Sequence, residues 1–230
     1  MKKLGVDFFK IASAEITNLH LIEFIADCGK PIVLSTGAAS IGEVEKAIDV
    51  IHRTGLREIA LQHCVLSYPC KDDDANLAKM VRLKQIFPDI PIGYSDHTFG
   101  AEVPLAAVAL GARSIEKHYT LDSRLPDSPD HKFALTSDEL GDFVKRCRRV
   151  EKSIGTYRSG HYAAEEKAYQ LARKSLVAVR RIKKGERITD RAVSCKRPGT
   201  GIYPEFLGVI VGRTAKKNIE PDELLSWDMF

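Results

Sequence analysis

Five strand-like segments, each followed by a helix-like segment, constrain the fold of this chain more than any other feature of its sequence. The strand-like segments are rich in β-branched and aromatic residues and lie at 6–13, 30–37, 58–65, 90–95 and 113–121. The helix-like segments carry apolar residues on one face and lie at 19–29, 40–55, 76–88, 101–111 and 136–155. Strands that alternate with helices at this spacing predict a parallel sheet covered by helices.

The number of units leaves two architectures open. Barrels of this type have about eight strand–helix units, so five units between residues 5 and 155 predict either an open sheet or part of a barrel. The helix boundaries are clearer, because Ser40 stands three residues before Glu43 and predicts a capping box. Thr136 or Ser137 is expected to cap the last helix of the series.

The pattern changes at Arg173, after which short alternating segments are separated by turns such as Lys-Lys-Gly-Glu. Residues 156–172 are polar and weakly helical, as in a connector. We therefore predict an α/β domain over residues 1–155, a linker over 156–172, and a small, mostly β domain over 173–230.

Composition excludes several functional classes. No apolar run approaches the roughly 20 residues that a membrane-spanning helix needs, and no small-residue cleavage site follows the first residues. The net charge of +4 is mild and its lysines and arginines are scattered, which argues against nucleic-acid binding. Five dispersed cysteines without a CxxC pair indicate reduced thiols and a cytoplasmic protein.

Polar residues gather at the predicted carboxyl ends of the strands, where parallel α/β folds place their ligands. They include Lys10, Ser13, Glu15, Ser35, Thr36, His63, Tyr68, Ser95, Asp96, His97, Glu116, Lys117 and His118. His97 and His118 end successive strands, so we expect both to face one cavity. Two neutral imidazoles with oxygen ligands suit Mn²⁺ or Mg²⁺. The hydroxyls, the lysines and the backbone amides of the Ser-Thr-Gly sequence suit a phosphate or carboxylate.

Structural roles remain open for several of these residues. Ser13 and Ser35 could cap the helices that follow them, and Lys10 could extend to solvent. A histidine at a strand end can be a hydrogen-bonded structural residue, which is the interpretation that we favour for His63. Cys64 is expected to act as a small buried hydrophobe. The residues alone predict a metal-assisted α/β enzyme that acts on an anionic substrate.

Several motifs resemble the sialic acid synthase (N-acetylneuraminate synthase) family over almost the whole chain. They are FKIASAEI, STGAASIGEVEKAI, LQHCVLSYP, IGYSDHTFG, SIEKHYTLD and KRPGTG. The resemblance implies a partial (β/α) TIM-type barrel that lacks the N-terminal part and begins near the fourth strand. It also implies that residues 173–230 form the antifreeze-like (SAF) domain of this family.

The resemblance further implies a reaction and a set of site residues. Phosphoenolpyruvate condenses with N-acetylmannosamine, its 6-phosphate or a related acetamido sugar, with Mn²⁺ or Mg²⁺, to give a sialic or other nonulosonic acid and phosphate. The metal ligands would be His97 and His118, which with Lys10 form the catalytic set. Phosphoenolpyruvate would contact Lys10, Ser13, Ser35 and Ser95, and the sugar would contact Tyr68, Asp130 and Arg197. Arg197 would reach across a domain-swapped homodimer into the partner's site.

Two departures from the family pattern leave rival interpretations open. The glutamate and a second phosphate-binding lysine expected of the family belong to the missing barrel portion, and Leu66 stands where relatives often have Asn or Thr. The chain could be a catalytically silent fragment that binds metal or anion, or a dimerisation partner of a full-length synthase. It could also be a different α/β aldolase with a carbohydrate-binding module. A five-strand fragment exposes two edges and its inner layer, so we expect it to be unstable as a monomer.

Overall fold

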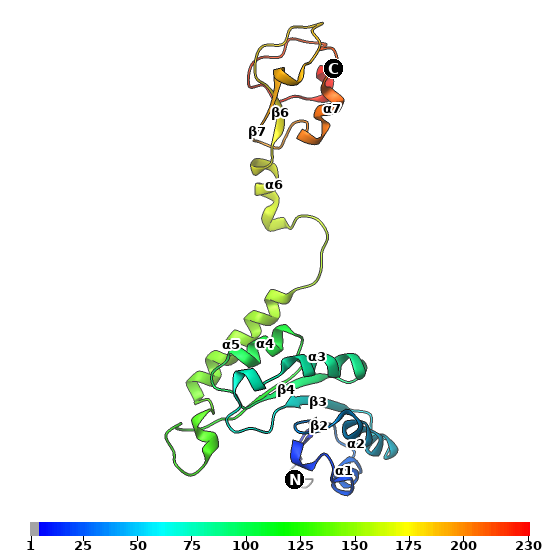
Figure 1. Cartoon of the computed structure of the whole chain (residues 1–230), viewed down its shortest axis with the longest axis vertical. Coiled ribbons are helices and arrows are strands. Elements are labelled where there is room, and N and C mark those ends of the chain that lie inside the picture. The colour runs from blue at the N-terminus through cyan, green and yellow to red at the C-terminus, as the bar shows by residue number, and fades with distance from the viewer. Residues whose placement is uncertain (1–4) are drawn as a thin grey trace. The chain divides into compact units, whose positions relative to one another are not determined.

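The chain divides into two compact units with a boundary between Thr156 and Tyr157. A computed structural model describes residues 5–230 (Figure 1). The first unit holds the parallel sheet and its helices, and the second holds a small antiparallel sheet. None of the helices described over this range is both long and apolar enough to cross a bilayer.

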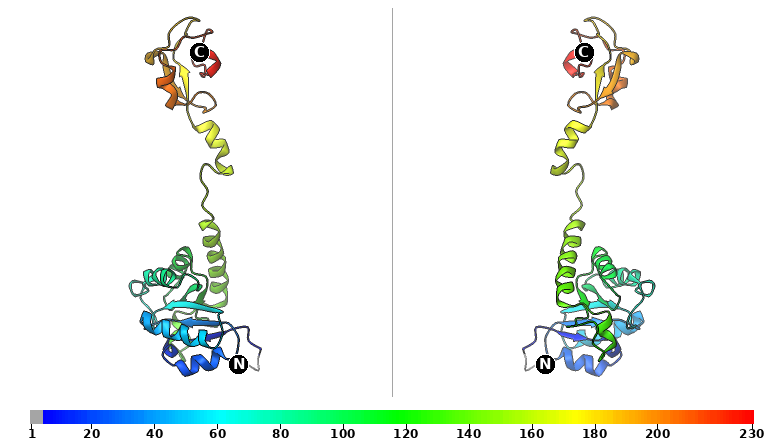
Figure 2. Two further views of the ribbon diagram at one scale, coloured as in Figure 1. Left: turned by 90° about the vertical axis from the view of Figure 1, so that its right-hand side faces the viewer. Right: turned by 90° about the vertical axis from the view of Figure 1, so that its left-hand side faces the viewer.

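The first unit is built on one parallel sheet with the strand order β1-β2-β3-β4-β5. The strands are β1 Phe9–Ile11, β2 Ile32–Ser35, β3 Ile59–Cys64, β4 Ile92–Asp96 and β5 Ile115–Lys117. The helices are α1 Leu19–Ala26, α2 Ile41–Arg53, α3 Leu77–Ile86, α4 Glu102–Ala109 and α5 Ser137–Ile154. Two further views show these helices packed around the sheet (Figure 2). The predicted partial β/α barrel is confirmed, although β5 ends four residues earlier than the sequence suggested.

Local sequence signals fix the ends of the helices. The Ser40 side chain accepts a hydrogen bond from the Glu43 amide at 3.3 Å, and the Glu43 carboxylate accepts one from the Ser40 amide at 2.8 Å. This is the predicted capping box, and α2 begins at the next residue. Of the two candidates for the cap of α5, Thr136 is the one observed, and its amide donates to Glu139 at 2.8 Å.

The apolar core of the first unit lies between the sheet and its helices. Successive side chains of a strand point to opposite faces, and one face supplies residues such as Ile32, Leu34 and Leu61 to this core. They pack against buried residues of α2, including Ala47 and Ile51. The other face of the sheet, here called the inner face, carries the polar side chains Lys10, Ser35, Gln62, Ser95 and Glu116. The apolar core residues and the polar side chains therefore lie on opposite faces of the sheet.

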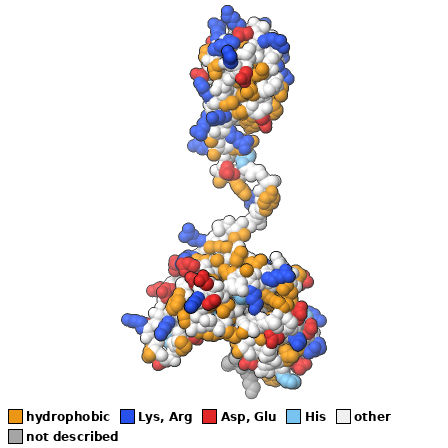
Figure 3. Space-filling model, viewed as in Figure 1, with side chains coloured by type: hydrophobic (Ala, Val, Ile, Leu, Met, Phe, Trp, Pro, Cys, Tyr) orange, Lys and Arg blue, Asp and Glu red, His pale blue; other side chains and the backbone are white. Residues whose placement is uncertain are grey.

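The second unit contains few regular strands. Strands β6 Ser175–Ala178 and β7 Val193–Lys196 are antiparallel, and helices α6 Glu166–Ala172 and α7 Leu207–Ile210 flank them in sequence. Single bridges such as Ile182 with Ile219 extend the strand pairing. Within residues 5–230 the 3₁₀ turns of both units are Ser13–Glu15, Asp72–Asp74, Pro129–Lys132, Ala163–Glu165, Asp190–Ala192, Pro204–Phe206 and Trp227–Met229. Basic side chains are prominent on the visible surface of this unit (Figure 3).

Candidate functional site

Two histidines from neighbouring strands lie side by side on the inner side of the sheet. His97 follows β4 and His118 follows β5, and their ring centroids are 5.1 Å apart with planes at 81°. Nδ1 of His97 is 2.8 Å from the carbonyl oxygen of Val65. Nδ1 of His118 is 3.3 Å from Oδ2 of Asp130. The Val65 carbonyl can only accept a proton, so His97 carries its proton on Nδ1 and its Nε2 lone pair remains for a ligand.

This arrangement fits a shared divalent ion. A metal about 2 Å from an imidazole nitrogen lies roughly 3 Å from the ring centre, so rings 5.1 Å apart suit adjacent positions around one ion. Within residues 5–230 no group of three or more His, Cys, Asp or Glu side chains forms a complete cage. Water or substrate oxygens would fill the other positions, as hard ions such as Mn²⁺ and Mg²⁺ accept.

Aromatic side chains frame the histidine pair. The Tyr68 ring lies 4.0 Å from the His97 ring, and Phe133 lies 5.0 Å from His118, between centroids. Phe133 is buried, whereas Tyr68 is 44% exposed and can present its hydroxyl to a ligand. Burial, and then the nearby Cys64 and Asp130, raise the pKa of Tyr68, so its phenol stays protonated at neutral pH. Tyr68 and Asp130, both predicted to contact the sugar, therefore lie beside the predicted metal ligands.

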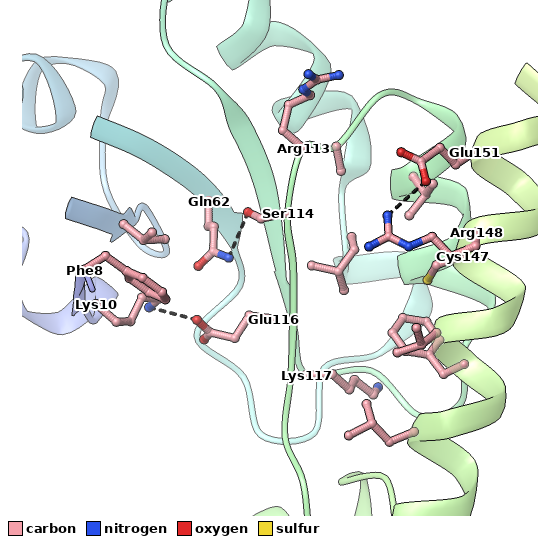
Figure 4. A pocket seen from close by; sticks show the side chains of 17 residues that line it. Phe8, Lys10, Gln62, Arg113, Ser114, Glu116, Lys117, Cys147, Arg148 and Glu151 are labelled. Carbon is pink, nitrogen blue, oxygen red and sulfur yellow. Dashed lines mark hydrogen bonds and ion pairs between the residues drawn. The ribbon is translucent and has the colours of Figure 1, made fainter. Parts of the chain in front are cut away.

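Three strands contribute to a charged cluster next to this pair. The Glu116 carboxylate lies 3.4 Å from Nζ of Lys10 and accepts a hydrogen bond from Ser95 at 2.8 Å. Figure 4 shows Lys10 and Glu116 pointing toward one another across the inner face. In a flat sheet β1 and β5 would lie about 19 Å apart, so this contact also shows that the sheet is curved. The Lys10 ammonium has further protons to donate to an anion, whereas the single hydroxyl proton of Ser95 is donated to Glu116.

The serines after β1 and β2 do not cap helices. Asn18 caps α1 and Ser40 caps α2, so the capping roles considered for Ser13 and Ser35 are wrong. The Ser13 hydroxyl accepts a hydrogen bond from the Gly37 amide at 2.8 Å. The Ser35 hydroxyl donates to Gln62 at 3.4 Å.

A cavity of about 660 Å³ opens beside the charged cluster. Lys10, Gln62 and Glu116 line it on the inner face, and it continues past the edge of β5 to α5 (Figure 4). Within it the side-chain nitrogen of Gln62 donates to the hydroxyl of Ser114 at 3.2 Å. The two histidines do not line this cavity, and Lys10 is the one predicted anion-binding residue that does.

Cys64 is buried, as predicted, but its neighbours are polar. Its sulfur lies 4.0 Å from Nδ1 of His97. Burial opposes ionisation of the thiol, but hydrogen bonds with His97, Ser13 and Ser95 outweigh it and lower the pKa of Cys64. The sequence analysis did not place this thiol among the site residues, although it lies on the same face of β3 as Gln62.

Asp96 and Lys117 adjoin the histidines in sequence but point away from them. Nζ of Lys117 lies 2.7 Å from Oδ2 of Asp96, and the two side chains are 2% and 0% exposed. The other oxygen of Asp96 accepts hydrogen bonds from the amide and hydroxyl of Thr98 at 3.0 and 2.8 Å. The prediction that grouped Asp96 and Lys117 with the site is wrong, because alternation along β4 and β5 turns both toward the helices.

Two other predicted residues, His63 and Arg197, make contacts within their own units. His63 is buried with Nε2 2.8 Å from the carbonyl oxygen of Ala75, and burial lowers its pKa. This is the structural role that we favoured from sequence. Arg197 belongs to the second unit, where its Nε donates to the carbonyl oxygen of Ala172 at 3.1 Å. Its role at the site stays a prediction.

Sequence reasoning missed Gln62, and it placed Glu116 at a strand end without giving it a role. Glu116 lies two residues before His118, and Gln62 two residues before Cys64, so each shares a strand face with a site residue. This period of two was the available signal for both.

A partial β/α barrel with an imidazole pair and polar side chains at its strand ends, followed by a small second domain, defines a class of β/α-barrel enzymes. Residues 1–159 match the NeuB family and residues 173–230 match the SAF domain. The chain belongs to the NeuB family.

Relatives of known name support this assignment. The chain is 43% identical over 231 residues to the N,N'-diacetyllegionaminic acid synthase of Campylobacter jejuni, covering 98% of this chain and 67% of that protein. It is 32% identical over 226 residues to the human N-acetylneuraminate-9-phosphate synthase, covering 98% and 62%. A sialic acid synthetase structure from Leptospira borgpetersenii superposes with a TM-score of 0.67 at 41% identity, covering 73% of this chain and 57% of that one. The chain thus spans about two thirds of the length of its named relatives or less.

Proposed function

We propose that this chain takes part in the condensation of phosphoenolpyruvate with an acetamido sugar of the N-acetylmannosamine type, or its 6-phosphate, to give a nonulosonic acid and phosphate. The observation that carries the proposal is the imidazole pair, whose rings are 5.1 Å apart and whose Nδ1 atoms lie 2.8 Å from the Val65 carbonyl oxygen and 3.3 Å from the Asp130 carboxylate. The relatives named as legionaminic and N-acetylneuraminate-9-phosphate synthases support this type of product.

Different residues of the chain would have different roles in this reaction. Lys10 and the hydroxyls of Ser13, Ser35 and Ser95 would hold the phosphate and carboxylate of phosphoenolpyruvate close to the sugar aldehyde. His97 and His118 would hold Mn²⁺ or Mg²⁺, which when bound polarises a carbonyl oxygen. C3 of phosphoenolpyruvate bonds to the aldehyde carbon and water adds at C2. The C2–O bond then breaks, and phosphate leaves with the bridging oxygen and the electron pair of that bond. The aldehyde oxygen becomes a hydroxyl and C2 becomes the keto carbon.

The sugar side of the site is proposed to include a second subunit. Tyr68 and Asp130 border the histidines in the first unit, and Arg197 would come from the second unit of a partner in a domain-swapped homodimer. We also propose a cytoplasmic location, which the five free cysteines support.

A second candidate function is supported by the incomplete metal cage and the unpaired sheet edges of the described residues. Residues 5–230 hold no third side chain that completes a metal cage, and β1 and β5 both end the sheet without a further strand. A chain of this kind could bind metal and anion without turnover and serve as a partner of a longer synthase.

A phosphate-release assay distinguishes the two candidates. The chain would be incubated with Mn²⁺, phosphoenolpyruvate and a panel of acetamido sugars, alone and with the N-terminal third of a named relative supplied as a separate polypeptide. We expect release that depends on sugar and stops on chelation, and that is lost in His97→Ala but kept in the exposed-site control His20→Gln. Mn²⁺ binding without release in either mixture would favour the silent partner instead.

A further inference from the structure

One buried hydroxyl forms hydrogen bonds with two residues of the turn that contains Arg197. The side chain of Ser175, the first residue of β6, is fully buried. Its hydroxyl donates to the carbonyl oxygen of Pro198 at 2.7 Å and accepts from the amide of Gly201 at 2.8 Å. A buried hydroxyl that satisfies groups on both sides of a turn restrains the turn strongly, because either group would be costly to leave unpaired.

The two glycines of this turn allow the approach. A Cβ atom at Gly199 would lie 2.6 Å from Cβ of Arg173, and one at Gly201 would lie 2.9 Å from the carbonyl oxygen of Leu225. The Gly199 amide donates to the carbonyl oxygen of Gln170 in α6 at 2.8 Å. The turn is therefore packed against the end of α6 on one side and anchored to β6 on the other.

Arg197 is held through one nitrogen only. Its Nε donates to the carbonyl oxygen of Ala172, the last residue of α6, at 3.1 Å. Over residues 5–230 no hydrogen bond or ion pair engages its two terminal nitrogens, and the side chain is exposed. A planar guanidinium fixed at Nε presents its remaining fork to a carboxylate, a phosphate or a pair of hydroxyls.

We propose that Ser175 is a positioning residue, which fixes the 197–201 turn so that Arg197 presents its guanidinium in one orientation to the sugar substrate. This inference rests on the proposed function, in which Arg197 contacts the sugar. The Ser175 hydroxyl acts only through the turn, since it is buried beneath it and cannot reach a ligand itself.

Ser175→Ala tests the proposal, with Ile210→Val as a matched control. Ile210 is also fully buried in the core of the second unit. Hydrogen exchange of the Gly201 amide and of the Arg197 Nε proton would be followed by NMR on the full chain. We expect both to exchange about tenfold faster or more in Ser175→Ala than in Ile210→Val, because two hydrogen bonds are lost. Equal exchange in the two variants would overturn the proposal.

The kinetic consequence is measured in the phosphate-release assay. Ser175→Ala should raise the sugar KM by about tenfold, should change the phosphoenolpyruvate KM far less, and should largely retain kcat. If Arg197→Ala raises the sugar KM and Ser175→Ala does not, Ser175 does not position the arginine. If Arg197→Ala itself leaves the sugar KM unchanged, Arg197 does not contact the sugar and the proposal is wrong. The hydrogen-exchange rates would still show whether Ser175 restrains the 197–201 turn.

Discussion

The buried pair of Asp96 and Lys117 gives the sharpest test of which polar residues are structural. Asp96→Asn keeps the shape of the side chain but leaves the Lys117 ammonium buried without a counter-charge. Removing one partner of such a pair costs about 3–5 kcal/mol, and Asp96 also loses the strength of two accepted hydrogen bonds from Thr98. Since domains are stable by only about 5–15 kcal/mol, the first unit should come close to unfolding.

Urea denaturation measures this effect with a control inside the chain. The single tryptophan, Trp227, lies in the second unit, so its fluorescence follows that unit while far-UV circular dichroism is dominated by helices of the first. We expect Asp96→Asn to shift the first transition only. Pairing it with Lys117→Met should recover much of the loss, because no unpaired charge remains. A loss below about 1 kcal/mol in Asp96→Asn, together with lost Mn²⁺ binding, would refute the structural role.

Three further predictions concern other residues of the chain. Burial lowers the pKa of His63 in the folded chain, so the unfolded chain binds this proton more tightly. The free energy of unfolding should therefore have its full value above about pH 6.5, and it should fall by up to about 1.4 kcal/mol per pH unit below that pH. His63→Gln should flatten this dependence in urea titrations, and His20→Gln should keep it. Gly93→Ala should destabilise by about 1–3 kcal/mol in the same assay, because its Cβ would lie 2.1 Å from the Ser114 hydroxyl; an unchanged midpoint would contradict this. Arg197→Ala should raise the sugar KM more than the phosphoenolpyruvate KM in steady-state kinetics, and the reverse order would count against its assigned contact.

The order of strands and helices in the first unit was predictable because its signals are local. Apolar periodicity marked the elements, and the Ser40 and Glu43 pair marked the start of α2. Periodicity also contains the information that separates His97 from Asp96, since neighbours in a strand point to opposite faces. Grouping Asp96 and Lys117 with the histidines ignored that rule, and applying it would have kept Glu116 and set Asp96 and Lys117 aside.

Other parts of the site depend on curvature and on tertiary packing. Lys10 and Glu116 lie on the first and last strands of the sheet, so their contact at 3.4 Å requires the strands between them to bend toward each other. The orientation of the imidazoles depends on acceptors that are distant in sequence or in a loop, namely the Val65 carbonyl and Asp130. No pattern within one segment specifies these contacts.

The placement of the core bears on the predicted instability of a partial barrel. Packing between sheet and helices supplies the apolar burial of the first unit, while the inner face is largely polar and can be solvated. The exposed edges of β1 and β5 remain the weak points, together with Phe8, which is 53% exposed beside them. The oligomeric state and unfolding midpoint of the isolated chain would measure their cost.

Direct measurement of Mn²⁺ binding tests the shared imidazole site most closely. Titration calorimetry and electron paramagnetic resonance on the full chain should show one Mn²⁺ site. Its affinity should fall by tenfold or more, about 1.4 kcal/mol, in both His97→Ala and His118→Ala, with an unchanged circular dichroism spectrum. Wild-type affinity in either variant would show that His97 and His118 do not share an ion and would contradict the account.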